Sequence, residues 1–165
     1  MSPGSWALLI ASLTAAAAAA AWAVARAMRR ARDGGGLVRA MYQFHGQREY
    51  VEAKFVDLAA HSGKPRGLVW VRCDFDDDVS YVRDKSTGQI SALVGVTIGF
   101  AAAEGGEMED VEAVGNLRAA TAVFHYAGKQ WMTQGRTLFN LSPTEAISRY
   151  HERFEIVAEE TAGTA

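Results

Sequence analysis

Residues 89–102, QISALVGVTIGFAA, decide the fold, because their apolar residues alternate with a period of two. Ile90 and Val94 fall on one side of this alternation, and Leu93 and Thr97 fall on the other. Successive side chains of a β-strand point to opposite faces of a sheet, so the pattern predicts a strand with one apolar face. The other face of this strand is only partly polar. We therefore expect a sheet whose second face is partly open.

Three further stretches extend the sheet. Residues 68–75 alternate in the same way, and a turn cluster at residues 84–88 that ends in a glycine predicts a hairpin with the strand at 89–102. Residues 111–126 are typical of a long strand, and a short turn leads from them into another strand at residues 130–139. The sheet is thus expected to contain four or five antiparallel strands.

A helix is predicted on each side of these strands. Residues 37–60 keep helical spacing, although Gly46 weakens their middle. The second helix has a strong start, with Ser142 as the N-cap, Pro143 at the first helical position and Glu145 completing a capping box. An apolar stripe extends this helix to residue 158: Ile147, Tyr150, Phe154 and Val157.

This order of elements predicts an α+β domain over residues 37–158, with both helices on one face of a curved antiparallel sheet. The element order resembles the small cone-shaped rolls of the nuclear-transport-factor and cystatin kind. That likeness rests on the order alone and implies no function. One core is sufficient for a chain of this length, and residues 159–165 are expected to form a disordered tail.

The N-terminal segment has the composition of a membrane anchor. Residues 3–25 carry no charged side chain, and four arginines follow at positions 26, 29, 30 and 32. A helix of this length reaches about 35 Å, enough to cross a hydrocarbon core of about 30 Å. We expect residues 1–32 to form a single-pass anchor in the cell membrane and residues 33–36 to form a glycine linker. The arginines predict that the globular part faces the cytoplasm.

Two alternatives for this segment stay open. Ala23 and Ala25 form the small-x-small pattern of a cleavable secretory signal, which would make the protein an exported one. No Lys or Arg precedes the apolar run, which argues against a signal peptide. The other alternative is a helix of a soluble protein, but no polar stripe at helical spacing interrupts the segment.

The rest of the chain is acidic. Four of the 17 basic side chains are the arginines of the anchor, which leaves 13 basic against 19 acidic side chains and a net charge of −6. Such a surface repels phosphate backbones, so we expect no nucleic-acid partner. The lone Cys73 excludes an intrachain disulfide, and its place in the alternation predicts a small buried side chain rather than a nucleophile.

The sequence predicts no metal site and no cofactor. Asp74, Asp76 and Asp78 match the first, third and fifth positions of a calcium-binding loop. The match fails later, because Val79 stands where a glycine is needed and Lys85 where a bidentate acid is needed. We expect this acidic stretch to form a solvated loop. The four histidines have no pair at ligand spacing, and the glycines form no phosphate cradle.

The candidate binding surface is the second face of the sheet. A face that carries tryptophan and arginine side chains inside a polar rim is typical of a protein interface or a shallow pocket. Strand alternation and a meander pairing place six residues there: Trp70, Arg72, Leu93, Thr97, Arg118 and Trp131. Packing of Trp70 beneath a loop or the N-terminal helix is the alternative for that residue.

Two hypotheses for function follow. The first is a single-pass membrane-tethered domain without enzymatic activity that binds another protein, or a second copy of itself, through the open sheet face. The second is a roll around a small-molecule pocket, in which Asp, His or Tyr side chains bind a ligand or carry simple acid–base chemistry. The sequence assigns no catalytic residue.

Overall fold

The computed structural model describes Trp22 and residues 35–62, 67–105 and 115–162. The chain divides into two compact units, residues 1–41 and 42–165. The predicted anchor therefore lies outside the described residues except for Trp22, whereas Gly35 and Gly36 of the predicted linker are helical. Within the described ranges, no helix has the length and apolar character needed to cross a membrane.

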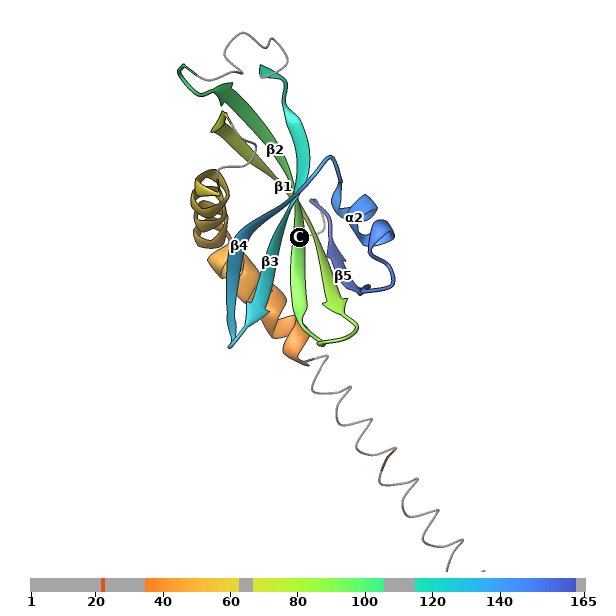
Figure 1. Ribbon diagram of the computed structural model, residues 1–165. Helices are drawn as coiled ribbons and strands as arrows, with labels where there is room; N and C mark the ends of the chain where they lie inside the picture. The colour runs from red at the N-terminus through yellow and green to blue at the C-terminus, as the bar shows by residue number, and fades with distance from the viewer. Residues whose placement is uncertain (1–21, 23–34, 63–66, 106–114, 163–165) are drawn as a thin grey trace, which may run out of the picture. The chain divides into compact units, whose positions relative to one another are not determined.

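Five antiparallel strands form one sheet in the order β4-β3-β2-β1-β5 (Figure 1). Together with two helices, this sheet confirms the predicted α+β fold. The strands are β1 (Leu68–Asp84), β2 (Ile90–Ala102), β3 (Arg118–Ala127), β4 (Gln130–Phe139) and β5 (Phe154–Glu160). The first four follow one another as a meander, and the last returns to pair with the outer side of β1.

A long helix over residues 35–61 supplies buried hydrophobic side chains to the core. Phe44 and Phe55 of this helix are completely buried. The ring of Phe44 lies 4.9 Å from that of Trp131, and the ring of Phe55 lies 5.7 Å from that of Phe124. Aromatic rings at such distances contribute beyond their buried area, so this face of the sheet carries the main apolar core.

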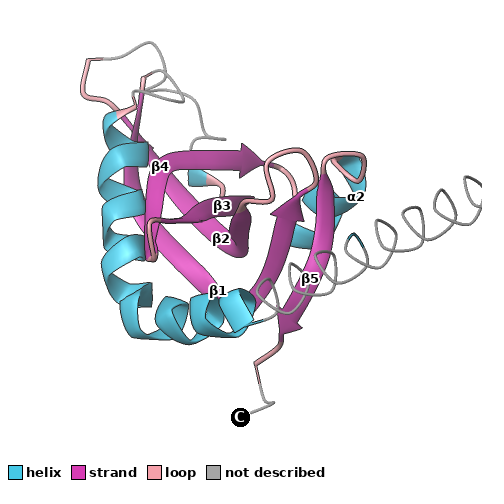
Figure 2. Ribbon diagram, turned by 90° about the horizontal axis from the view of Figure 1, so that it is seen from below, coloured by secondary structure: helices cyan, strands magenta, loops and turns pink. Residues whose placement is uncertain are grey.

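The second helix, α2 (Pro143–Arg149), covers the other face of the sheet. Its capping box forms as predicted, since the Ser142 side chain accepts a hydrogen bond from the Glu145 N–H. Ile147 packs with a buried cluster that includes Val82, whereas Tyr81, the preceding residue of β1, packs against Phe44 of the long helix. Neighbouring residues of a strand face opposite ways, so the prediction that both helices cover one face is wrong (Figure 2).

The predicted extent of the C-terminal helix is also wrong. The helix ends at Arg149, and residues 154–160 form β5 instead. The Lys85 N–H donates to the Arg153 carbonyl at 2.8 Å, and the Arg153 guanidinium donates to Asp84 at 2.6 Å. These bonds bring the end of the chain alongside β1, where a strand satisfies backbone groups that a helix would leave unpaired.

The acidic stretch predicted to be a loop belongs to β1. This strand continues through residues 74–78, with its pairing to β2 irregular between Phe75 and Val79. The Arg48 side chain donates hydrogen bonds to the backbone carbonyls of Asp76 and Asp77, the latter at 3.0 Å. The long helix, which carries Arg48, thereby holds residues 74–78 in an extended conformation, although the aspartates of this segment have low strand propensity.

Candidate functional site

The six residues predicted to share the second sheet face do not come together. The pairing of β1 with β2 shifts between Trp70 and Arg72, because Val71 is an extra residue there. The shift places Trp70 on the side of the long helix, with its ring 6.4 Å from that of Phe55. The alternation predicted for residues 68–75 is therefore wrong at Trp70, and packing under the N-terminal helix is its actual environment.

The other predicted residues divide between the two faces. Trp131 is 3% exposed and lies on the helix side with Phe44, and Arg118 is exposed at the start of β3 opposite Ile98. Leu93 lies fully buried beneath α2. Only Arg72 and Thr97 occupy neighbouring positions on the second face, and the Arg72 guanidinium is paired there with Asp74.

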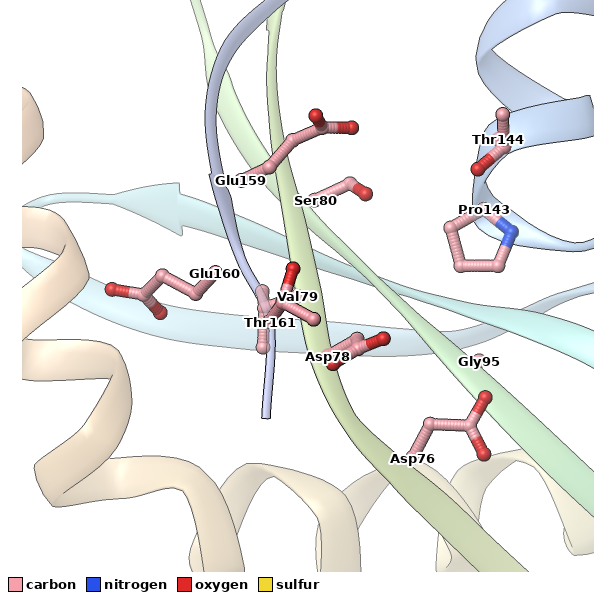
Figure 3. A pocket seen from close by; sticks show the side chains of 10 residues that line it. All are labelled: Asp76, Asp78, Val79, Ser80, Gly95, Pro143, Thr144, Glu159, Glu160 and Thr161. Atoms are coloured by element: carbon pink, nitrogen blue, oxygen red, sulfur yellow. The ribbon is translucent and has the colours of Figure 1, made fainter. Parts of the chain in front are cut away.

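A pocket of about 220 Å³ lies on the α2 side of the sheet, between β1, β2, the end of β5 and the first turn of α2 (Figure 3). Four acidic residues belong to its lining, together with hydroxyl-bearing residues of β1 and α2 and the threonine that follows β5. The lining residues are Asp76, Asp78, Val79, Ser80, Gly95, Pro143, Thr144, Glu159, Glu160 and Thr161. We call this the acidic pocket.

Gly95 of β2 makes room for the carboxylate of Asp76. A Cβ atom at position 95 would lie 3.0 Å from Asp76 Cγ and still closer to a carboxylate oxygen. The irregular pairing between Phe75 and Val79 brings Asp76 across β2 at this point. A glycine inside a strand commonly marks such a close approach, and here it permits a charged group to lie flat on the sheet.

Glu159 and Glu160 are the last two residues of β5, and as consecutive strand residues they point to opposite faces of the sheet. Glu159 pairs with Ser80 in the register, and Figure 3 shows both side chains directed toward Thr144. Glu160 points the other way, where its Oε2 accepts a hydrogen bond from the Tyr81 hydroxyl at 2.9 Å and lies 2.9 Å from His45 Nε2. Burial and the bond to Glu160 raise the pKa of Tyr81 well above its usual range.

The carboxylates of the pocket differ in whether they already have a hydrogen-bond or ion-pair partner within the protein. Asp78 accepts a hydrogen bond from the Ala162 N–H at 2.6 Å, which holds the chain after β5 against β1. Arg48 is engaged by Glu52 and by backbone carbonyls. In the part of the chain that the structure describes, the side chains of Asp76 and Glu159 make no hydrogen bond or ion pair. These two exposed carboxylates are the unpaired charges of the pocket.

A serine and a histidine meet elsewhere on this side of the sheet. Ser91 Oγ lies 2.9 Å from His125 Nδ1, and the two residues stand directly opposite each other on β2 and β3. Ser91 is 3% exposed, so its hydroxyl is not accessible to a substrate. Burial, with the nearby charges of Arg136 and Arg153, lowers the pKa of His125 and favours its neutral form. The pair is a cross-strand hydrogen bond within the sheet.

No group of three or more His, Cys, Asp or Glu side chains in the described ranges is arranged to hold a metal ion. The hydrogen-bond acceptors and negative charge of the acidic pocket suit an organic cation, such as an ammonium or guanidinium group. Sequence reasoning weighed Asp76 and Asp78 only as calcium ligands and assigned Glu159 to a tail. The glycine at position 95 was the signal that could have located the site.

Comparison with known proteins gives no relative from which a function could be taken. The chain matches no protein-family model, no curated protein and no solved structure.

Proposed function

We propose that this protein is a binding module that takes a cationic group of a partner protein into the acidic pocket while residues 1–32 tether it to a membrane. The observation that carries the proposal is the pair of unpaired carboxylates, Asp76 and Glu159, on the lining of one pocket. Ser80 and Thr144 add hydroxyl groups beside them. Ammonium and guanidinium groups carry several donors, which such a set of acceptors can satisfy together.

The magnitude of the attraction favours a cation that meets several carboxylates. A single exposed ion pair is worth about 0–1 kcal/mol, because water screens it. A cation in the pocket would meet Asp76 and Glu159 and lie close to Asp78, with hydroxyl groups in reach. The net charge of −6 on residues 33–165 adds long-range attraction, which speeds the encounter with a basic partner.

Binding explains the described ionisable groups better than acid–base catalysis does. The Tyr81 hydroxyl is bonded to Glu160 and the Ser91 hydroxyl faces His125, so these groups are engaged inside the fold. Their pKa shifts favour the neutral tyrosine and the neutral imidazole. A roll with a catalytic small-molecule pocket stays a prediction from the element order alone.

The tether is proposed from sequence, since residues 3–25 are uncharged and are followed by four arginines. On the cytoplasmic side the acidic domain would be repelled by anionic lipids, which keeps the pocket directed toward proteins rather than the bilayer. Sedimentation of the full-length chain with membranes, and its release only by detergent, tests this part of the proposal. Recovery in the soluble fraction without detergent would contradict it.

Calorimetric titration of the full-length protein with a tetralysine peptide tests the pocket. We expect binding that weakens as salt rises, and a double variant, Asp76→Asn with Glu159→Gln, that binds about tenfold more weakly. The amide side chains keep the size of the originals and remove only charge. Glu104→Gln, an exposed acid beyond the other end of β2, is the matched control. Equal affinities for the double variant and the wild-type protein would refute the proposal.

A further inference from the structure

We infer that the cationic group reaches the acidic pocket as a side chain of an extended basic segment, which adds as a sixth strand to the free edge of β5. This inference rests on the proposed function and names the class of partner. An exposed sheet edge offers a row of backbone donors and acceptors that an extended peptide can satisfy, with side-chain sites giving specificity.

The two edges of the sheet differ. At the β4 edge, the Trp131 N–H donates to the Gln47 side chain of the long helix at 3.1 Å. Farther along β4, Gly135 adopts a φ of +68°, and a Cβ atom there would lie 2.7 Å from the backbone nitrogen of Ala59. The long helix therefore occupies the β4 edge, and no strand can add there.

The β5 edge is open within the described part of the chain. β5 stands last in the strand order, and its only described strand partner is β1 (Figure 2). The Lys85 N–H donates to the Arg153 carbonyl, and backbone groups of an antiparallel strand alternate in direction. Ile156, three residues after Arg153 and opposite Val82, therefore directs its N–H and C=O away from β1. Its side chain is 49% exposed.

The charge of β5 selects the occupant. The strand FEIVAEE carries three glutamates and no basic residue, and its last residues line the acidic pocket. Pairing of two β5 strands from two copies would set glutamates against each other, which is destabilising. Val157 is an extra residue in the pairing of β5 with β1, so Glu155 and Glu159 lie on opposite faces. A segment that alternates lysine with an apolar residue would instead set its lysine side chains on the face of β5 that carries Glu159 and the acidic pocket, and its apolar residues on the opposite face beside Ala158. The occupant is therefore a basic extended peptide rather than a second copy.

Three peptides of equal charge test this inference against the full-length protein by fluorescence anisotropy. The first alternates lysine with valine over seven residues. The second and third carry N-methyl groups on one or the other set of alternate backbone amides. Edge addition uses only the amides that face β5, so we expect one N-methylated peptide to bind at least tenfold more weakly and the other to bind like the unmodified peptide. The protein itself is unchanged, so its folding does not enter the result.

Equal binding of all three peptides would overturn edge addition and leave the pocket proposal standing, because charge alone would then suffice. Failure of the lysine–valine peptide beside successful binding of tetralysine would overturn it in the same way. Failure of every basic peptide would refute both proposals. Sedimentation of the protein alone as a dimer that the lysine–valine peptide does not dissociate would assign the edge to a second copy and overturn the inference.

Discussion

The indole ring of Trp70 on β1 lies 6.3 Å from the phenyl ring of Phe139 on β4, although two strands separate β1 from β4 in the sheet. Phe100 of β2 lies between them, 5.5 Å from Trp70 and 6.3 Å from Phe139. Side chains of strands so far apart meet only when the sheet curls strongly toward one face. These aromatic rings therefore pack together on the side of the sheet that faces the long helix. The acidic pocket lies on the other side, beside α2.

Trp70→Ala is expected to reduce the free energy of unfolding by about 2–4 kcal/mol, less than the loss for a completely buried tryptophan because Trp70 is half-buried. Val71→Ala is the matched control, since the side chain of Val71 is 62% exposed and its loss should cost less than about 0.5 kcal/mol. Urea denaturation followed by circular dichroism measures both. Equal losses for the two variants would mean that Trp70 does not close the core.

Gly95→Ala is expected to displace the Asp76 carboxylate and to weaken tetralysine binding about threefold, with little change in stability because a flexible exposed side chain can move. Gly99→Ala is the control, because Gly99 lies on the same face of β2 as Gly95 but its Cβ would approach Arg72 of β1 and not the pocket. In an Asp76→Ala background, Gly95→Ala should cost little further affinity. Additive losses in calorimetric titrations would show that Gly95 acts independently of Asp76.

Periodicity gave the correct sheet elements where the chain is regular. The alternation of residues 89–102 predicted β2, and the capping box predicted where α2 begins. Periodicity failed where one segment fits two periods. Tyr150, Phe154 and Val157 suit a helical stripe, yet residues 154–160 pair with β1, and only the tertiary contacts of Arg153 decide between the two.

The candidate site was less predictable than the fold. One extra residue at Val71 moved Trp70 to the other face, and no sequence rule locates such a bulge. The acidic pocket combines residues that lie more than 80 positions apart, Asp76 and Glu159, so it exists only once β5 has paired with β1. Residues 74–78 also have low strand propensity, so the sequence predicted a loop there. They belong to β1 because Arg48 of the long helix donates hydrogen bonds to their backbone.

The environment of the Asp84 carboxyl predicts how the free energy of unfolding depends on pH. Hydrogen bonds from the Ser86 side chain, from Arg153 and from the Thr87 N–H hold the pKa of this carboxyl far below its usual range. A lowered pKa stabilises the fold at pH values above about 4, the pKa of an unfolded aspartate, and this contribution falls as the pH drops further. We expect Asp84→Asn to lower stability at pH 7 and to flatten the loss of stability below pH 4.

Chemical denaturation of both proteins between pH 2 and pH 7 measures this difference, with Asp77→Asn at an exposed position as the control. The control should reproduce the wild-type pH profile. A profile for Asp84→Asn parallel to that of the wild-type protein would show that this carboxyl does not carry the linkage.

Cys73 should be unreactive in the folded protein. Burial, with the charges of Asp74 and Glu52, raises the pKa of its thiol to about 12. At pH 8 only about one thiol in 10⁴ is then ionised, and the thiolate is the reactive form. Iodoacetamide should therefore modify the native protein at least about 100-fold more slowly than the protein unfolded in urea. Similar rates in the two states would contradict this environment for Cys73.

The most direct test of the acidic pocket is a nuclear magnetic resonance titration of the isotope-labelled full-length protein with tetralysine. The account predicts that the largest shift changes occur at the backbone amides of Gly95, Thr144 and Glu159, which lie on three different elements around one pocket. They should disappear in the Asp76→Asn, Glu159→Gln double variant. Shift changes confined to residues outside the acidic pocket, or none at saturating peptide, would contradict the account.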